Sequence, residues 1–109
     1  MGMQEPTFLI LTAVAGEPLH GYGVLLAVAE LSGGDVKLRP GTLYGALDRL
    51  TEQGLIEVDR EEAVDGRLRR YYRITEPGAG ALAAEAARLR RNADAAERRL
   101  RVVPLGGGA

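Results

Sequence analysis

The chain of 109 residues contains no cysteine and no tryptophan, and it has a single phenylalanine and a single histidine. The absence of cysteine excludes a disulfide framework, a thiolate metal site and a cysteine nucleophile. Because His20 is the only histidine, a histidine pair is excluded. In a Ser-His-Asp set, His20 would have to fill every role that requires a histidine. No glycine-rich phosphate loop precedes a predicted helix. We therefore expect no enzyme, and neither a metal nor a cofactor.

Long apolar runs are also missing. The apolar stretch from Phe8 to Ala15 is far shorter than the ~20 residues that a membrane span needs. It also has no basic flank of the kind that marks a signal peptide. The sequence therefore predicts a soluble, cytoplasmic protein without a membrane partner, and its length allows one domain with a modest core.

Charge is nearly balanced, with a formal net charge of -1, but its distribution is uneven. Residues 1–35 carry four acidic side chains and neither lysine nor arginine. Residues 66–75 carry four arginines and no acid. A local patch of one sign guides charged partners more than the sum does. The second segment is therefore a candidate contact for nucleic acid.

Three helices are predicted in the first half of the chain. Pro6 to Ala15 is apolar and indicates a short buried helix. A second helix begins near His20 and ends at Ser32-Gly33-Gly34. A third begins at Pro40, where the missing N–H of proline is harmless, and ends at Gln53-Gly54.

The third helix has two different faces. Leu43, Leu47 and Leu50 form one stripe that we expect to face the core. The opposite side carries Thr42, Gly45, Asp48, Arg49 and Glu52. A helix that enters a DNA groove needs this division, together with a first turn that bases and phosphates can approach. Gly41 keeps that approach open, and the helix N-terminus offers N–H groups to a phosphate.

A hairpin follows directly. Residues 55–62 and 67–74 flank Asp65-Gly66, a dipeptide that favours hairpin turns. Strand alternation puts Leu68, Arg70, Tyr72 and Ile74 on one face, and we expect its apolar members in the core. The other face is basic and aromatic, and it carries Arg67, Arg69, Tyr71 and Arg73.

The last predicted helix, from about Gly78 to Arg101, repeats small or apolar residues alternately four and three positions apart. This heptad spacing is typical of a helix that pairs with another helix. The stripe is too narrow for the domain's own core, and Glu85 is expected on the outer surface. The simplest partner is the same helix of a second copy. The predicted dimer interface contains Leu82, Ala86, Leu89, Ala93, Ala96 and Leu100.

Together these elements predict an α+β, mostly helical fold: a winged helix-turn-helix DNA-binding domain with a C-terminal dimerisation helix. We expect the DNA-binding domain over residues 5–75, the dimerisation helix over 76–103 and a disordered tail over 104–109.

The residues also resemble a known family. HGYGVLLAVAEL, then RPGTLYGALDRLTEQGLIE and RLRRYYRITEPG, resemble the PadR family of bacterial transcriptional repressors. The resemblance covers roughly Phe8 to Leu100 and looks like the short subclass. It implies a homodimer that represses transcription at an inverted-repeat operator of double-stranded DNA and is released by a small-molecule effector or another signal. It places the recognition helix on residues 40–53 and the wing on 57–73. Gly45 departs from the pattern, because many relatives have proline there.

Candidate DNA contacts come from the recognition helix, the segment before it and the wing. They are Lys37, Arg39, Thr42, Tyr44, Arg49, Arg67, Arg69 and Arg73.

Alternatives remain open for several of these residues. Thr42 is also suited to cap its helix, and Tyr44 lies where packing and phosphate contact are evenly matched. The wing arginines also fit a solvated strand face. Asp48 repels phosphate, although it is also placed to orient Arg49.

For three further residues packing is the favoured interpretation. His20 is expected to be structural or a helix cap, and Tyr22 and Tyr72 are expected to pack. A second hypothesis for the whole chain is a winged helix that binds protein instead of DNA. The basic wing face argues for DNA.

Overall fold

The computed structural model describes residues 2–103, so the predicted disordered tail over 104–109 lies outside the described residues. Within this range the chain forms four helices and three strands. They are α1 (Glu5–Gly16), β1 (Leu19–His20), α2 (Gly21–Leu31), α3 (Pro40–Glu52), β2 (Ile56–Val64), β3 (Arg67–Ile74) and α4 (Glu76–Arg101). Four helices and a hairpin occur in the predicted order. The two-residue strand β1 was not predicted.

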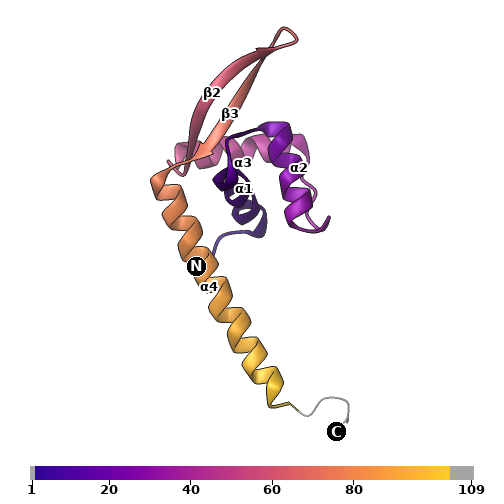
Figure 1. Ribbon diagram of the computed structural model, residues 1–109, viewed down its shortest axis with the longest axis vertical. Coiled ribbons are helices and arrows are strands. Elements are labelled where there is room, and N and C mark those ends of the chain that lie inside the picture. The colour runs from indigo at the N-terminus through magenta and orange to yellow at the C-terminus, as the bar shows by residue number, and fades with distance from the viewer. Residues whose placement is uncertain (1, 104–109) are drawn as a thin grey trace.

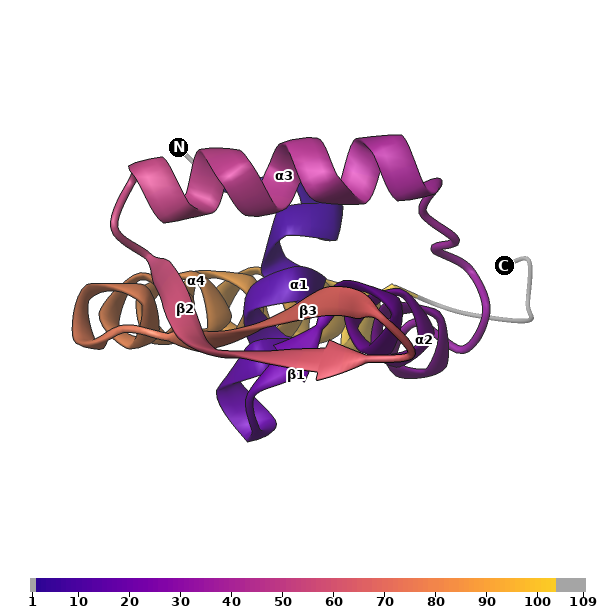
Figure 2. The ribbon, with the colours of Figure 1, turned by 90° about the horizontal axis from the view of Figure 1, so that it is seen from above.

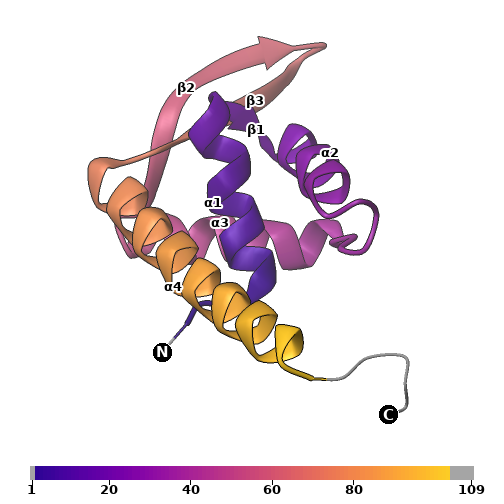
Figure 3. The ribbon, with the colours of Figure 1, turned by 60° about the horizontal axis from the view of Figure 1, so that its bottom comes forward.

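The core forms between α1, α2 and α3, and Figure 3 shows α1 crossing in front of α3 with α2 beside it (Figures 2 and 3). Leu43, Leu47 and Leu50 are buried, which confirms the stripe predicted for α3. They pack with buried side chains of the other elements, namely Ile10, Leu11 and Val14 of α1, Val24 and Val28 of α2, Ile56 of β2 and Tyr72 of β3. Burial of this apolar surface is the main favourable contribution to folding.

The sheet is antiparallel, with the strand order β1-β3-β2. Leu19 pairs with Tyr72 and His20 with Tyr71, so β1 adds a short edge strand just before α2. Between Val58 and Arg60 the register of β2 shifts by a β-bulge. A bulge adds one unpaired residue and changes the side on which later side chains project. Beyond the bulge, β2 and β3 extend away from the helices as a wing (Figure 1).

Two apolar side chains expected to pack inside are exposed. Leu68 is 67% exposed, and the prediction of a core position is wrong because it lies near the turn, beyond the reach of the helices. Tyr22 is 61% exposed, so the packing expected for it is also wrong. The inner face of α2 is instead formed by Val24 and Val28. Tyr72 is buried, as predicted.

Helix α4 has two parts. Its first half runs beside α1 (Figure 3), and Leu82 packs against the core. The prediction that this stripe has no place in the domain's own core is therefore wrong for the first half. From Leu89 to Arg101 every residue is exposed, and this half extends clear of the other helices (Figure 1). No helix within residues 2–103 is both long and apolar enough to cross a bilayer.

Glu85 lies on the buried side of α4, and only 6% of it is exposed, so its predicted surface position is wrong. Its carboxylate accepts hydrogen bonds from Nε and a terminal nitrogen of Arg88, at 2.9 and 2.5 Å. The backbone N–H of Met3 donates to the same carboxylate at 3.2 Å. Hydrogen bonding by Arg88 lowers the pKa of Glu85, since these donors favour the charged form. The contact joins the N-terminal segment to α4.

These elements form the predicted α+β winged helix-turn-helix. Helices α2 and α3 are the helix-turn-helix pair, β2 and β3 are the wing, and α4 follows the wing.

Candidate nucleic-acid interface

The N-terminus of α3 is open. Arg39 is the N-cap residue and Pro40 opens the first turn, and no side chain caps this end with a hydrogen bond. The alternative that Thr42 caps α3 is therefore wrong. Thr42 is exposed, as are Lys37 and Arg39 in the segment that leads into α3. These residues leave backbone N–H groups of the first turn available to an external acceptor.

The exposed face of α3 begins with two glycines one turn apart. A Cβ atom added at Gly41 or Gly45 would meet no atom of residues 2–103 within 4 Å. Neither glycine has the left-handed backbone conformation that side chains disfavour. Neither internal packing nor backbone geometry therefore requires glycine at these positions, although glycine weakens a helix. Asp48 and Glu52 follow on the same face and are exposed. The part of α3 that an anionic surface can approach is therefore its first two turns.

Tyr44 lies on the flank of α3 that faces α2. A Cβ atom added at Gly21 would lie 2.5 Å from the Tyr44 hydroxyl oxygen and 2.8 Å from the ring. Tyr44 thus packs on the first residue of α2, while 49% of it stays exposed. The alternative that Tyr44 packs is therefore correct for the part of the ring that contacts Gly21. The rest of the side chain is exposed to solvent.

A groove of about 740 Å³ separates α3 from the wing. Tyr44 and Asp48 line it from α3, and His20, Gly21 and Tyr22 line it where α2 begins. The wing contributes Glu61, Val64, Asp65, Arg67, Leu68, Arg69, Arg70 and Tyr72. Arg70 is paired with Glu61 at 3.1 Å. Arg67 and Arg69 have no ion-pair partner among residues 2–103.

On the opposite flank of α3, Thr42 and Arg49 line a smaller hollow of about 220 Å³ beside the start of α1. Asp48 lines the groove on the other flank, so it does not orient Arg49 as one alternative suggested. The predicted contacts of α3 therefore lie on both flanks of the helix, with Tyr44 toward the wing and Thr42 and Arg49 away from it. Thr42 and Tyr44 belong to the first two turns, whereas Arg49 lies in the last turn.

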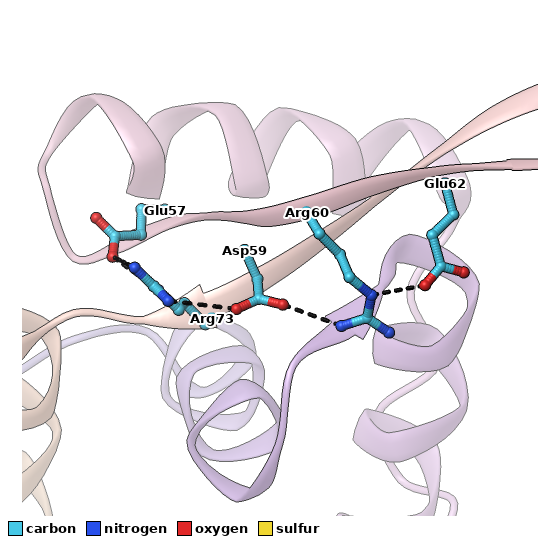
Figure 4. Close-up of polar contacts among 5 residues, drawn as sticks. All are labelled: Glu57, Asp59, Arg60, Glu62 and Arg73. Carbon is cyan, nitrogen blue, oxygen red and sulfur yellow. Dashed lines mark hydrogen bonds and ion pairs between the residues drawn. The ribbon is translucent and has the colours of Figure 1, made fainter.

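The third predicted wing contact, Arg73, is held by carboxylates. Its guanidinium lies 2.7 Å from Glu57 and 3.3 Å from Asp59. Asp59 also binds Arg60 at 2.9 Å, and Arg60 binds Glu62 at 2.6 Å (Figure 4). We call these five residues the ion-pair ladder. The expectation that Arg73 offers a free charge on an acid-free face is wrong, because β2 supplies acids opposite the arginines of β3.

His20 packs against Tyr71, with ring centroids 5.2 Å apart. Its backbone is the N-cap of α2, but its side chain makes no capping hydrogen bond, so the structural interpretation holds without the cap. Burial, and then the positive charge of Arg69, lower the pKa of His20 below 6.5. Both effects favour the neutral form of the ring.

The predicted dimer residues are divided between two environments. Leu82 and Ala86 are partly buried within their own chain. Leu89, Ala93, Ala96 and Leu100 are exposed along the free half of α4. Within the described residues no segment covers this second group.

An exposed recognition-type helix, a wing beside it and a trailing helix define a winged-helix protein, and comparison with known proteins gives the family. Residues 10–84 match the model of the Transcriptional regulator PadR-like family, and this is more than half of the chain. The protein therefore belongs to the PadR-like family of transcriptional regulators, as the sequence resemblance predicted.

A curated relative, named Transcriptional regulator Rv3488, comes from Mycobacterium tuberculosis. It is 42% identical over 73 residues, which are 67% of this chain and 64% of that relative. The chain thus spans somewhat less than two thirds of the relative's length.

Two crystal structures support the fold. A PadR family transcription regulator from Clostridium difficile is 23% identical, with a TM-score of 0.73 over 89% of this chain and 99% of that chain. Bacillus subtilis PadR in complex with operator DNA is 22% identical, with a TM-score of 0.66 over 74% of this chain and 46% of that chain.

Proposed function

We propose that this protein is a sequence-specific DNA-binding transcriptional regulator that acts as a homodimer on an inverted-repeat operator. In this proposal the first two turns of α3 enter the major groove, and the wing contacts the neighbouring phosphates. We further propose that the protein represses transcription in the cytoplasm and that a small molecule or another signal releases it. Two comparisons support DNA binding by a transcriptional regulator. The chain matches the PadR-like family, and Bacillus subtilis PadR has been solved in complex with operator DNA.

The observation that carries the proposal is the open surface at Gly41 and Gly45. Two helical glycines that no internal contact requires leave the α3 backbone accessible to a close-fitting partner. Arg67 and Arg69, which have no ion-pair partner within residues 2–103, line the adjacent groove, where they can meet phosphate oxygens. Tyr44, Thr42 and the cations Lys37 and Arg39 surround the same helix end. Arg49, in the last turn of α3, completes the proposed contact surface.

The homodimer is proposed from the free half of α4. Leu89, Ala93, Ala96 and Leu100 continue the heptad spacing into a region where no segment of residues 2–103 covers them. A two-fold pairing of this helix would bury them and would place two recognition helices on one face of DNA. Helix-turn-helix dimers place their recognition helices one duplex turn apart, about 34–36 Å.

A salt titration tests the DNA proposal. The affinity for a duplex library should fall as salt rises, because each phosphate contact releases a counterion and contributes ~0.9 to the slope of log affinity against log salt. In a dimer Arg69→Ala removes two contacts, so the slope should decrease by roughly 2. Specific and non-specific DNA should be affected alike, since phosphate contacts do not read sequence.

Arg98→Ala is the matched control. It removes the same charge from an exposed position on the free half of α4, away from the wing, and should leave the slope unchanged. Equal slopes for the natural chain, Arg69→Ala and Arg98→Ala would contradict the proposed interface. Salt-independent or undetectable binding would favour the competing hypothesis, a winged helix that binds protein.

A further inference from the structure

The ion-pair ladder determines which wing arginines are free. Residues directly opposite one another in an antiparallel pair project to the same side of the sheet. Glu62 pairs in register with Arg69, so the two side chains are cross-strand neighbours of opposite charge. They form no ion pair in the structure, because the Glu62 carboxylate is bound by Arg60 at 2.6 Å.

Arg60 is held by three groups. It donates hydrogen bonds to Asp59 at 2.9 Å and to Glu62 at 2.6 Å. Its guanidinium carbon also lies 4.0 Å from the centroid of the Tyr71 ring. An isolated exposed ion pair holds its partners weakly, but two carboxylates and an aromatic face together define one position for this side chain.

The β-bulge brings these groups together. In a regular strand, alternation would place residues 57, 59 and 61 on one face. After the bulge Arg60 lies opposite Tyr71 and Glu62 lies opposite Arg69. The ladder therefore uses Glu57, Asp59 and Glu62 to bind Arg60 and Arg73 (Figure 4). Arg67 and Arg69 remain without an ion-pair partner among the described residues.

We infer that Arg60 is a positioning residue that holds Glu62 away from Arg69 and so keeps Arg69 available to phosphate. Arg60 acts through Glu62 and needs no contact with DNA. When Arg60 is lost, Glu62 pairs with its cross-strand neighbour, and the phosphate contact of Arg69 is lost with it. The claim that Arg69 contacts phosphate rests on the proposed function. The claim that Arg60 keeps Glu62 from pairing with Arg69 does not.

The first test is a salt titration of DNA affinity with two variants. Arg60→Gln should lower the salt slope by roughly 2 in a dimer, as Arg69→Ala does, because one phosphate contact is lost in each subunit. The double variant Arg60→Gln/Glu62→Gln should restore the slope of the natural chain, because no carboxylate then competes for Arg69. Circular dichroism should show the same helix content for all of these chains.

Two results would overturn the inference. A normal slope for Arg60→Gln would show that Arg60 does not control Arg69. A double variant with the same low slope as Arg60→Gln would show that Arg60 contacts phosphate itself. In both cases the reduced slope of Arg69→Ala would still support the proposed function.

The second test uses no DNA. Thermal unfolding of four chains gives the coupling energy between the Glu62 and Arg69 side chains. The four are the natural chain, Glu62→Gln, Arg69→Gln and the combined variant Glu62→Gln/Arg69→Gln. We expect no coupling when Arg60 is present and a stabilising coupling in the Arg60→Gln background. A coupling already present in the natural chain, or none in either background, would overturn the inference whether or not the protein binds DNA.

Discussion

Tyr44 of α3 lies so close to Gly21 that a Cβ atom there would stand 2.5 Å from the tyrosine hydroxyl oxygen. The first residue of α2 and the second turn of α3 are thereby fitted to one another. The contact fixes the position of the recognition helix relative to the helix before it.

The Tyr44–Gly21 contact predicts opposite results for two variants. Gly21→Ala should destabilise the protein by about 1 kcal/mol, at the low end for overpacking, because the added methyl group displaces the Tyr44 ring, which is half exposed and can shift. Tyr44→Phe should leave stability nearly unchanged, because the ring remains. Chemical denaturation measures both. Equal stability of Gly21→Ala and the natural chain would show that Tyr44 does not press on α2.

Gly45→Ala separates folding from DNA binding. Alanine should stabilise α3 by roughly 1 kcal/mol, because glycine is the poorer helix former and the added Cβ meets nothing. DNA affinity should nevertheless fall, because the methyl group lies on the face proposed to approach the duplex. Thermal unfolding and a DNA-binding titration test the two halves. A variant that is more stable and binds as tightly as the natural chain would place the interface elsewhere.

Two glycines of α4 form a matched pair. A Cβ atom at Gly78 would lie 1.9 Å from the carbonyl oxygen of Leu55, whereas one at Gly80 would meet nothing within 4 Å. Gly78→Ala should therefore cost roughly 1–3 kcal/mol or more, since a backbone atom must move. Gly80→Ala should raise stability by up to about 1 kcal/mol. Chemical denaturation measures the free energy of unfolding of both variants. If the two substitutions change it in the same direction, α4 does not begin against Leu55 as described.

Glu85 predicts a component of the acid sensitivity. Its pKa in the folded protein is lowered, first by Arg88, from an ordinary value of 4.5. Its contribution to stability is therefore full above pH 4.5 and is lost as the pH falls through the lower folded pKa. Glu85→Gln should reduce stability at pH 7 and flatten the loss on acidification. Glu97→Gln, exposed on the same helix, is the control and should leave the pH profile of thermal unfolding unchanged.

The proposed dimer predicts a change in assembly without loss of the fold. Leu89 is 39% exposed in the single chain, so a glutamate there is compatible with the folded protomer. In a paired helix seam it would bring two like charges into an apolar contact, and unpaired buried charge costs about 3–5 kcal/mol. Sedimentation should show Leu89→Glu as a folded monomer, and Ala95→Glu, exposed and off the seam, as a dimer. A dimeric Leu89→Glu would rule out this interface.

The helices and the hairpin could be predicted because local patterns determine them. The leucine spacing of α3, the proline at its start and the Asp-Gly turn each act over a few residues. The prediction that Leu68 lies in the core is wrong because strand alternation gives the face on which a side chain lies. It does not give how far along the strand the helices cover that face. Tyr72 and Leu68 share a face, yet only Tyr72 lies over the core.

The electrostatics of the wing could not be predicted from one strand. Arg73 has no acidic neighbour within β3, and its partners Glu57 and Asp59 belong to β2. Their arrangement depends on a bulge that no local sequence signal identified. The position of Glu85 likewise depends on the N-terminal segment. The backbone N–H of Met3 donates a hydrogen bond to Glu85, although the two residues are far apart in the sequence. Such contacts become visible only when distant segments are placed together.

The most direct test of the DNA-binding account is the selection of sequences bound by the natural chain from a pool of random duplex DNA. The account predicts an enriched inverted repeat with half-sites about 10 base pairs apart, centre to centre. Thr42→Ala should enrich an altered half-site, whereas Arg69→Ala should enrich the same site with lower yield at raised salt. Failure to enrich any sequence, or enrichment of a single asymmetric half-site, would contradict the account.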